Sequence, residues 1–230
     1  MKKIQISLIT ILFFMPLYLF GQKTSPTVSY TFEGDFYEVS SIEEAQAPLD
    51  ATFKANPENM DGHTVAYEWH FRKREDGKGV KELFVRYEED TQYTFNESGR
   101  YEVTLKFFID NDDEAWDSTT INIFIADSWL EFPNAFSPNG DGYNDKFQAK
   151  KGYKSIVDFH AYIINRWGQK LFEWTNPADG WDGKYKGKDV SDGVYFLLVK
   201  ARGGDGKEYN IRKDVNLLRK HLEGGNNSGK

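Results

Sequence analysis

The sequence predicts an all-β protein with two β-sandwich domains. Apolar residues alternate with polar ones in several short segments, turn-forming clusters separate these segments at regular spacings, and no capped helical periodicity is sustained after the first 22 residues. The 230 residues are 39% hydrophobic and 16% aromatic, which is enough for one or two small cores and argues against disorder. Cysteine is absent, which excludes disulfides, thiolate metal sites and cysteine nucleophiles.

The N-terminus has the layout of a secretory signal peptide. Lys2 and Lys3 precede an apolar run from Ile4 to Phe20, and Gly21 provides a small residue before a cleavage point. An uncleaved membrane anchor is the alternative, because a run of this length is just able to span a bilayer. We predict a signal peptide over residues 1–21, which places the mature protein outside the cytoplasm.

Charge divides the mature chain into two unlike halves. Residues 22–127 contain 10 Lys/Arg and 23 Asp/Glu, whereas residues 128–230 contain 17 and 13. This shift predicts a boundary near residue 128, with an N-terminal extension over residues 22–44 and a linker over residues 128–131. Because the basic residues are dispersed rather than gathered on one face, we expect no nucleic-acid partner.

The acidic half is predicted to be a series of strands and turns. Strands are predicted at residues 67–72, 101–109 and 118–126, and the last two alternate so that one face is apolar. The predicted inward side chains are Tyr101, Val103, Leu105, Phe107, Ile121, Ile123 and Ile125. Turn clusters at residues 56–63, 74–79, 96–99 and 110–114 separate these strands, as in a sandwich.

Four segments of this half resemble a PKD-type immunoglobulin-like domain over residues 45–127. They are "APLDATF" (47–53), "YEWHF" (67–71), "YTFNESGRYEVTL" (93–105) and "DSTTINIFI" (117–125). Trp69 is then the large central core side chain, and Gly99 permits the turn that leads into the strand of Tyr101. The resemblance implies an extracellular spacer or adhesive module, and the alternative is a polysaccharide-binding module.

Several surface residues of the acidic half have alternative interpretations. Trp116 is a candidate for stacking on sugar rings, or else Trp116 and Trp129 pack on their own domain at strand ends. The acidic run at residues 110–114 either holds calcium, which needs six to eight oxygen ligands, or forms a solvated hairpin tip. The triplet "DST" (117–119) resembles a short bacterial O-glycosylation pattern, with Ser118 as the acceptor.

The second half predicts another small sandwich. Val157, Phe159, Ala161 and Ile163 alternate on one strand, residues 165–168 form a turn, and residues 170–174 run back as the hairpin partner. Gly193 opens the next strand, and "GGDG" (203–206) turns it into the last one.

Four ordered segments of this half resemble the gliding-motility-associated C-terminal domain, the type B sorting domain of type IX secretion, over residues 132–219. They are "FSPNGDGYND" (136–145), "NRWG" (165–168), "WDGKYKG" (181–187) and "DGVYF" (192–196). The residues that carry the resemblance are Pro138, Asn139, Gly140, Asp141, Gly142, Asn144, Asp145, Asn165, Arg166, Trp167, Gly168, Trp181, Asp182, Gly183, Gly193 and Tyr195. The resemblance implies a signal read by the outer-membrane translocon of type IX secretion, with a PorP/SprF-like outer-membrane barrel as a partner.

The segment at residues 136–145 also has two chemical interpretations. Aligned with an EF-type calcium loop, it lacks the first aspartate and the final glutamate, which are Ser137 and Gln148 here. Calcium binding would then use Asn139, Asp141, Asn144 and Asp145. The alternative is an Asx-turn loop, in which Pro138 fixes the entry and Gly140 and Gly142 take positive φ.

No pattern in the sequence points to catalysis. The four histidines show no HExxH spacing, and no GxSxG elbow, phosphate-binding loop or dinucleotide-binding loop is present. We therefore expect a secreted or cell-surface protein that is not an enzyme and needs no cofactor, calcium apart. Residues 220–230 are rich in glycine and asparagine, and we predict a disordered tail.

Overall fold

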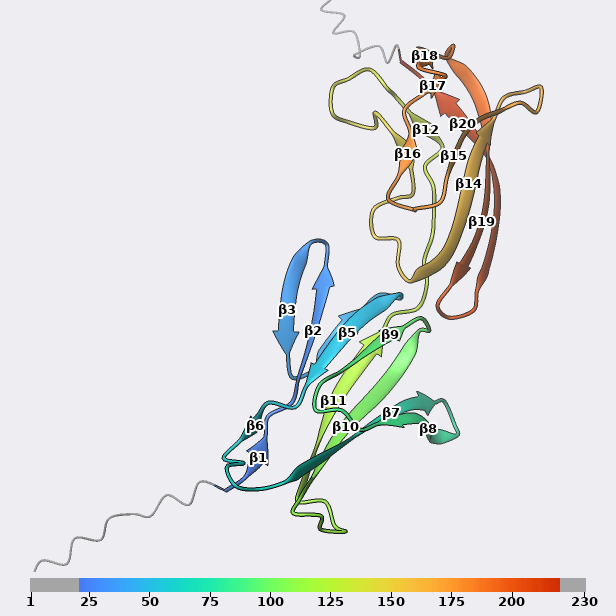
Figure 1. The fold of residues 1–230 in the computed structure, drawn as a ribbon. Coiled ribbons are helices and arrows are strands. Elements are labelled where there is room, and N and C mark those ends of the chain that lie inside the picture. The colour runs from blue at the N-terminus through green and yellow to red at the C-terminus, as the bar shows by residue number, and fades with distance from the viewer. Residues whose placement is uncertain (1–20, 220–230) are drawn as a thin grey trace, which may run out of the picture.

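The computed structural model describes residues 21–219, and these residues form strands and connecting segments (Figure 1). The predicted signal peptide, apart from Gly21, and the predicted tail at residues 220–230 lie outside the described residues. Between residues 21 and 219 there is no helix with the length and apolar character needed to span a membrane. The predicted all-β class with two tandem sandwiches is confirmed.

Two sheets build the first domain. The larger sheet has the order β4 (Ile42–Ala45), β11 (Asp117–Ile125), β10 (Gly99–Ile109), β7 (Val65–Glu75) and β8 (Gly79–Arg86). The smaller sheet has the order β3 (Asp35–Val39), β2 (Thr27–Phe32), β5 (Leu49–Lys54) and β9 (Thr91–Phe95). A short pair, β1 (Lys23–Thr24) with β6 (Pro57–Glu58), closes the end of the domain that is remote from the second domain (Figure 1).

The topology of the first domain is immunoglobulin-like. Strand β11 pairs antiparallel with β10 and parallel with the short β4, while β10 pairs antiparallel with β7. The opposite sheet contains the antiparallel pairs β2–β5 and β5–β9. Trp69 on β7 is 0% exposed at the centre of the core, as predicted, and its Nε1 donates to the carbonyl groups of Glu88 and Glu89.

The alternation read from the sequence describes the larger sheet correctly. The side chains predicted to point inward on β10 and β11 are all buried: Tyr101, Val103, Leu105, Phe107, Ile121, Ile123 and Ile125. Gly99 has a φ of 139°, in the range that favours glycine, at the point where the chain enters β10.

Residues 22–44 are not an extension outside the sandwich, and this prediction needs correction. Strand β2 pairs with β5 in the smaller sheet, and β4 pairs with β11 in the larger one. Val28 and Ile42 from these strands are buried in the first core. The segment is part of the domain because its apolar side chains complete that core.

The second domain repeats the plan of the larger sheet. Its order is β12 (Ala135–Phe136), β20 (Glu208–Leu217), β19 (Gly193–Gly203), β14 (Ile156–Ile164) and β15 (Lys170–Trp174). The short β12 runs parallel to β20, as β4 does to β11 in the first domain. The predicted hairpins are confirmed, because β14 pairs with β15 across residues 165–168 and β19 pairs with β20 across the 203–206 turn.

The opposite layer of the second domain is reduced to very short strands. Strand β13 (Phe147–Gln148) pairs with β16 (Gly180–Trp181), and a separate hairpin joins β17 (Lys184–Tyr185) to β18 (Lys188–Asp189). Large side chains rather than long strands fill this layer, since Phe147 and Trp181 are buried and both pack against Phe136 of β12 in the five-stranded sheet. Phe159, Ala161 and Ile163 are buried in this core as predicted, whereas Val157 packs against the core of the first domain.

Candidate recognition surface of the C-terminal domain

Three connecting segments of the second domain lie at its end away from the first domain (Figure 1): residues 137–146, 165–168 and 182–192, together called the distal loops. Strand directions explain this placement. Strand β14 begins beside the first domain, so the turn that follows it lies at the other end, about 30 Å away for nine residues of strand. The sequence segments that carry the family resemblance therefore meet at one end of the fold.

The first distal loop is held by the carboxylate of Asp145. Its Oδ1 accepts the N–H groups of Asn139 at 3.0 Å and Gly140 at 2.7 Å, and its Oδ2 accepts the N–H of Gly142 at 2.8 Å. The N–H groups of Gly140 and Gly142 are the main reason that the pKa of Asp145 lies below its ordinary value. Gly140 and Gly142 have φ values of 84° and 87°, as the turn interpretation predicts.

A second carboxylate completes the same loop. Asp141 accepts the N–H of Tyr143 at 2.7 Å through Oδ1 and the side-chain amide of Asn139 at 2.8 Å through Oδ2, while Asn139 accepts the N–H of Asp141 at 3.1 Å. The structure thus brings the predicted calcium ligands into one loop, but their carboxylate oxygens already accept N–H groups. Over residues 21–219, no group of three or more His, Cys, Asp or Glu is arranged to hold a metal ion. Calcium binding stays a prediction.

The second distal loop is a turn organised by Asn165. Its side-chain oxygen accepts the N–H groups of Trp167 and Gln169, each at 3.0 Å, and its carbonyl accepts the N–H of Gly168 at 2.9 Å. Gly168 has a φ of 80°. The ring of Trp167 is left 78% exposed with the guanidinium of Arg166 over it, 5.0 Å from the ring centroid.

The third distal loop is tied to the segment that follows β20 by Arg219. One guanidinium nitrogen of Arg219 donates to the carbonyl of Gly183 at 2.7 Å and another donates to the carbonyl of Val190. A Cβ on Gly183 would lie 2.9 Å from this guanidinium and 3.0 Å from the ring of Pro138. Gly183 also has a φ of 78°, so this position requires glycine for both its backbone and its surroundings.

Trp181, Gly193 and Tyr195 support the loops from below. Trp181 is buried, packs against Tyr195 with ring centroids 5.0 Å apart, and donates from Nε1 to the carbonyl of Lys184 at 2.8 Å. Asp182 accepts the N–H of Lys184 at 3.0 Å. Gly193 has a φ of 150° at the start of β19, and burial raises the pKa of Tyr195. These residues shape the distal loops rather than presenting reactive groups.

Among the residues that hold the distal loops, sequence reasoning missed Arg219. It lies two residues after the end of β20, and a single arginine in such a place gives no pattern. Its importance comes from the carbonyl groups it gathers, which belong to residues about 30 positions earlier in the chain.

Comparison with known families decides the assignment of this domain. Residues 130–213 match the family model of the CHU_C type IX secretion signal domain. The resemblance stated from the sequence is confirmed for this signal domain. Its presence implies that the protein is exported through the type IX secretion system to the cell surface or the extracellular space, and that it interacts with the secretion machinery.

Other comparisons add little to the assignment of the signal domain. No curated protein matches the chain. Among solved structures, the FN1–FN3 domains of chicken CNTN1 are 10% identical, with 85% of this chain and 89% of that chain covered and a TM-score of 0.25. Drosophila N-cadherin EC1–4 is 13% identical, with 85% and 58% covered and a TM-score of 0.22. At these TM-scores the likeness carries no argument.

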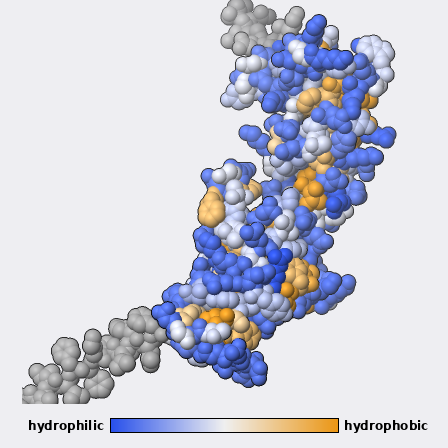
Figure 2. Space-filling view, in the orientation of Figure 1, coloured by the Kyte–Doolittle hydropathy of each residue, from blue (hydrophilic) through white to orange (hydrophobic). Residues whose placement is uncertain are grey.

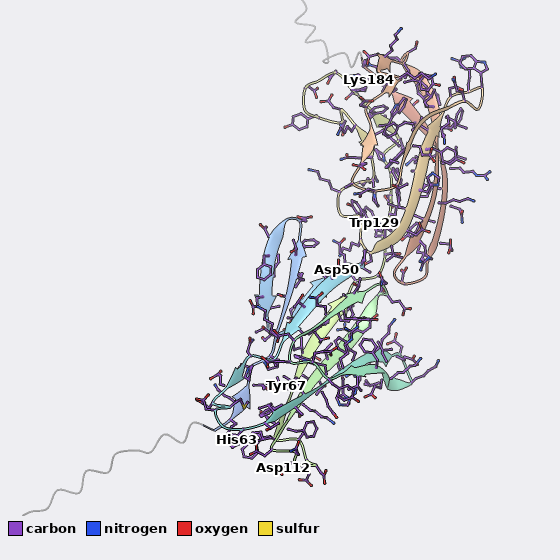
Figure 3. All side chains as sticks on the ribbon, in the orientation of Figure 1. Asp50, His63, Tyr67, Asp112, Trp129 and Lys184 are labelled. Carbon is purple, nitrogen blue, oxygen red and sulfur yellow. The ribbon has the colours of Figure 1, made fainter. Side chains whose placement is uncertain are left out.

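The candidate residues of the first domain lie apart from one another. Trp116 is 54% exposed in the β10–β11 turn and donates from Nε1 to the carbonyl of Gln22 at 3.0 Å, while Trp129 lies in the connection between the domains (Figure 3). Ser118 is exposed at the start of β11. The exposed aromatic side chains are Phe36, Tyr37, Tyr87 and Trp116, and they come from three different segments rather than one sheet face.

Proposed function

We propose that this protein is a non-catalytic surface or extracellular protein, in which the signal domain directs type IX export and the first domain is the delivered cargo. The observation that carries the proposal is the family match over residues 130–213, combined with the gathering of its sequence motifs in the distal loops. The distal loops are then the part of the signal domain that the secretion machinery reads.

The chemistry of the distal loops supports this assignment. Tyr143 and Trp167 are each 78% exposed on loops whose backbones are fixed by carboxylate and amide side chains. Exposed aromatic rings on a rigid backbone are typical of the anchor residues of protein interfaces. We propose a PorP/SprF-like outer-membrane barrel protein as the component that contacts them.

The first domain is proposed to act as an adhesive or spacer module. It resembles PKD-type domains, its interior is filled by large side chains such as Trp69 and Phe53, and its sequence has an excess of 13 negative charges over residues 22–127. Hydrophilic residues cover most of the visible surface, and apolar residues form only small, scattered patches (Figure 2). Within residues 21–127, the exposed aromatic rings form no single platform that would favour the polysaccharide-binding alternative.

Secretion of variants in the native host tests the proposal. Deleting residues 132–219 is expected to stop the protein from reaching the cell surface and the medium. The double change Tyr143→Ala and Trp167→Ala is expected to reduce export several-fold without lowering the melting temperature, because both rings are solvent-exposed. Trp116→Ala in the first domain is the matched control and should be exported normally.

Each outcome of this experiment decides a separate part of the proposal. Normal surface delivery after the deletion would refute the export role of the signal domain. Normal export of the double variant would instead show that the machinery reads another surface. Loss of a PorP/SprF-like protein from the host should trap the chain in the periplasm if that partner is assigned correctly.

A further inference from the structure

The two domains meet through a closed ring of hydrogen bonds. Ser98 of the first domain donates its N–H to the carbonyl of Gly204 at 3.0 Å, and Gly204 donates its N–H to the carbonyl of Ser155 at 2.8 Å. The hydroxyl groups of Ser155 and Ser98 both donate to the carbonyl of Ala126, at 2.6 and 2.8 Å. The ring, called the joint, thus links two residues of the second domain to two of the first.

Burial makes the joint different from a surface contact. Ser155 is 1% exposed, and Ser98, Ala126 and Gly204 are also buried. The Oγ of Ser155 additionally accepts the N–H of Ala47 at 3.1 Å. Because a buried polar group that loses its partner is strongly unfavourable, the members of the ring are held together as a set.

The close packing of the two domains at the joint also restricts which residues fit there. A Cβ on Gly204 would lie 3.0 Å from the Cβ of Ala47 and 3.0 Å from the Oγ of Ser98, so no larger residue fits without displacement. The φ of Gly204 is not positive, so backbone conformation does not explain why glycine stands at this position. The close approach of the two domains explains it. Ser155 has a φ of 46°, a conformation that is unfavourable for serine and is maintained here by its three hydrogen bonds.

The connection between the domains is also closed. Ser128 is buried, and its hydroxyl donates to Asp205 at 2.7 Å and lies 2.9 Å from the hydroxyl of Tyr209. Trp129 exchanges two backbone hydrogen bonds with Lys154, at 3.1 and 2.9 Å. The segment predicted as a linker at residues 128–131 is therefore paired backbone and buried side chains rather than an open tether.

We propose that the joint locks the two domains into one rigid body and closes the 126–131 connection to proteases, so that the signal domain stays attached to the first domain after export. The attachment of the signal domain after export rests on the proposed function, whereas the rigid connection between the two domains does not. A protease needs an extended stretch of backbone in its active site, and the paired connection offers none until the joint opens.

Limited proteolysis of the purified full chain tests the lock. Among the sites of a glutamate-specific protease, two are compared: the bond after Glu114, in the exposed β10–β11 turn, and the bond after Glu131, whose carbonyl accepts the N–H of Lys150 at 2.8 Å. Mass spectrometry of the fragments is expected to show cleavage after Glu131 at least tenfold slower than after Glu114. Equal rates at the two sites would overturn the proposal.

Variants distinguish an effect of the joint on cleavage from a general loss of stability. Ser155→Ala removes the hydroxyl that donates to the carbonyl of Ala126 and accepts the N–H of Ala47. Gly204→Ala adds a Cβ that forces the domains apart. Each is expected to accelerate the cut after Glu131 at least fivefold while the rate after Glu114 stays unchanged. Ser191→Ala, at an exposed serine in a distal loop, is the matched control. If neither joint variant changes the ratio of the two rates, the ring does not close the connection.

The intact mass of the exported protein tests retention. We expect a species that still contains residues 132–219, and a product that ends between residues 126 and 131 would overturn retention. If no protein is exported, the proposed function fails, and the proteolysis experiment still decides whether the lock exists.

Discussion

Tyr101 and Tyr195 occupy equivalent positions in the two domains. Each lies near the start of a long central strand and donates its hydroxyl to the carbonyl four residues earlier, Glu97 at 2.9 Å and Ser191 at 2.6 Å. This arrangement is the tyrosine corner of immunoglobulin-like sandwiches. Burial is the main reason that the pKa of Tyr101 is raised, so its hydroxyl stays protonated and able to donate.

Removing one corner hydroxyl should destabilise its own domain. We expect Tyr101→Phe to lower the free energy of unfolding by about 1–2 kcal/mol, because a hydrogen bond is lost and the carbonyl of Glu97 loses its partner. Tyr195→Phe should act in the same direction with a smaller effect, since Ser191 is exposed and water replaces the hydroxyl. Denaturant unfolding measures both variants, and an unchanged stability of Tyr101→Phe would contradict the assignment.

The first distal loop should respond to acid through Asp145. Its folded-state pKa is lowered from 3.8, so the stabilisation it gives is complete above that value and is lost as the pH falls through the lower folded pKa. Asp145→Asn should therefore melt at a lower temperature than the parent protein at pH 7, and the two should converge below about pH 4. A difference that is constant with pH would exclude this role of the carboxylate.

Calcium binding in the same loop has its own test. Because the carboxylate oxygens of Asp141 and Asp145 already accept N–H groups, a cation has to compete with those donors for the lone pairs of the same oxygens. We expect the same melting temperature in excess calcium chloride and in EDTA. A rise with calcium that is absent in Asp145→Asn would establish the calcium site that the sequence pattern suggests.

Sequence reasoning succeeded at residues whose role is local. Trp69 and Gly99 follow from strand alternation and turn chemistry within a few positions of the chain, and both are placed as predicted. Ser155 and Gly204 were missed because their roles depend on partners far away in sequence, such as Ala47, which is 108 residues from Ser155. An ordinary serine and one glycine of a "GGDG" turn carry no local sign of such a contact.

At the scale of elements, long strands were predictable and short ones were not. Strands β10, β11 and β14 have nine or more residues each, and part of each strand alternates clearly, as at residues 121–125 of β11 and 159–163 of β14. Strands β12, β13 and β16 have two residues each, which is too short for any period to appear. Residues 22–44 looked like an extension for a different reason, since their place in the fold depends on pairing with β5 and β11 rather than on their own pattern.

The packing of the distal loops on one another can be tested at Gly183. Gly183→Ala should destabilise the signal domain by about 1–3 kcal/mol, because the new Cβ meets Arg219 and Pro138 and the backbone keeps a positive φ. Gly187→Ala is the matched control, because Gly187 has a φ of 77° and a Cβ added there would meet no atom within 4 Å. Thermal unfolding of both variants isolates the effect of packing. An equal loss of stability in the two variants would show that backbone strain alone destabilises Gly183→Ala.

At the scale of the whole molecule, the two domains should stabilise each other. Val157 of the second domain packs against the first core, and Lys154 forms an ion pair with Glu44 at 2.6 Å across the boundary. We expect the isolated segment 128–219 to melt at a lower temperature than the same domain in the full chain, as measured by calorimetry. Identical melting temperatures would show that the contact between domains contributes no stability.

The places where the chain enters and leaves each domain have a consequence for how further domains can be added. In the second domain the entry strand β12 runs parallel to the last strand β20, so the chain leaves at the end opposite to the one where it enters. The first domain likewise begins with β1 at the end remote from the second domain and finishes with β11 beside it (Figure 1). Domains of this plan join head to tail in a line. Further domains inserted before residue 21 would lengthen the molecule at the end opposite to the distal loops, so its length is free to vary while the distal loops keep the same surroundings.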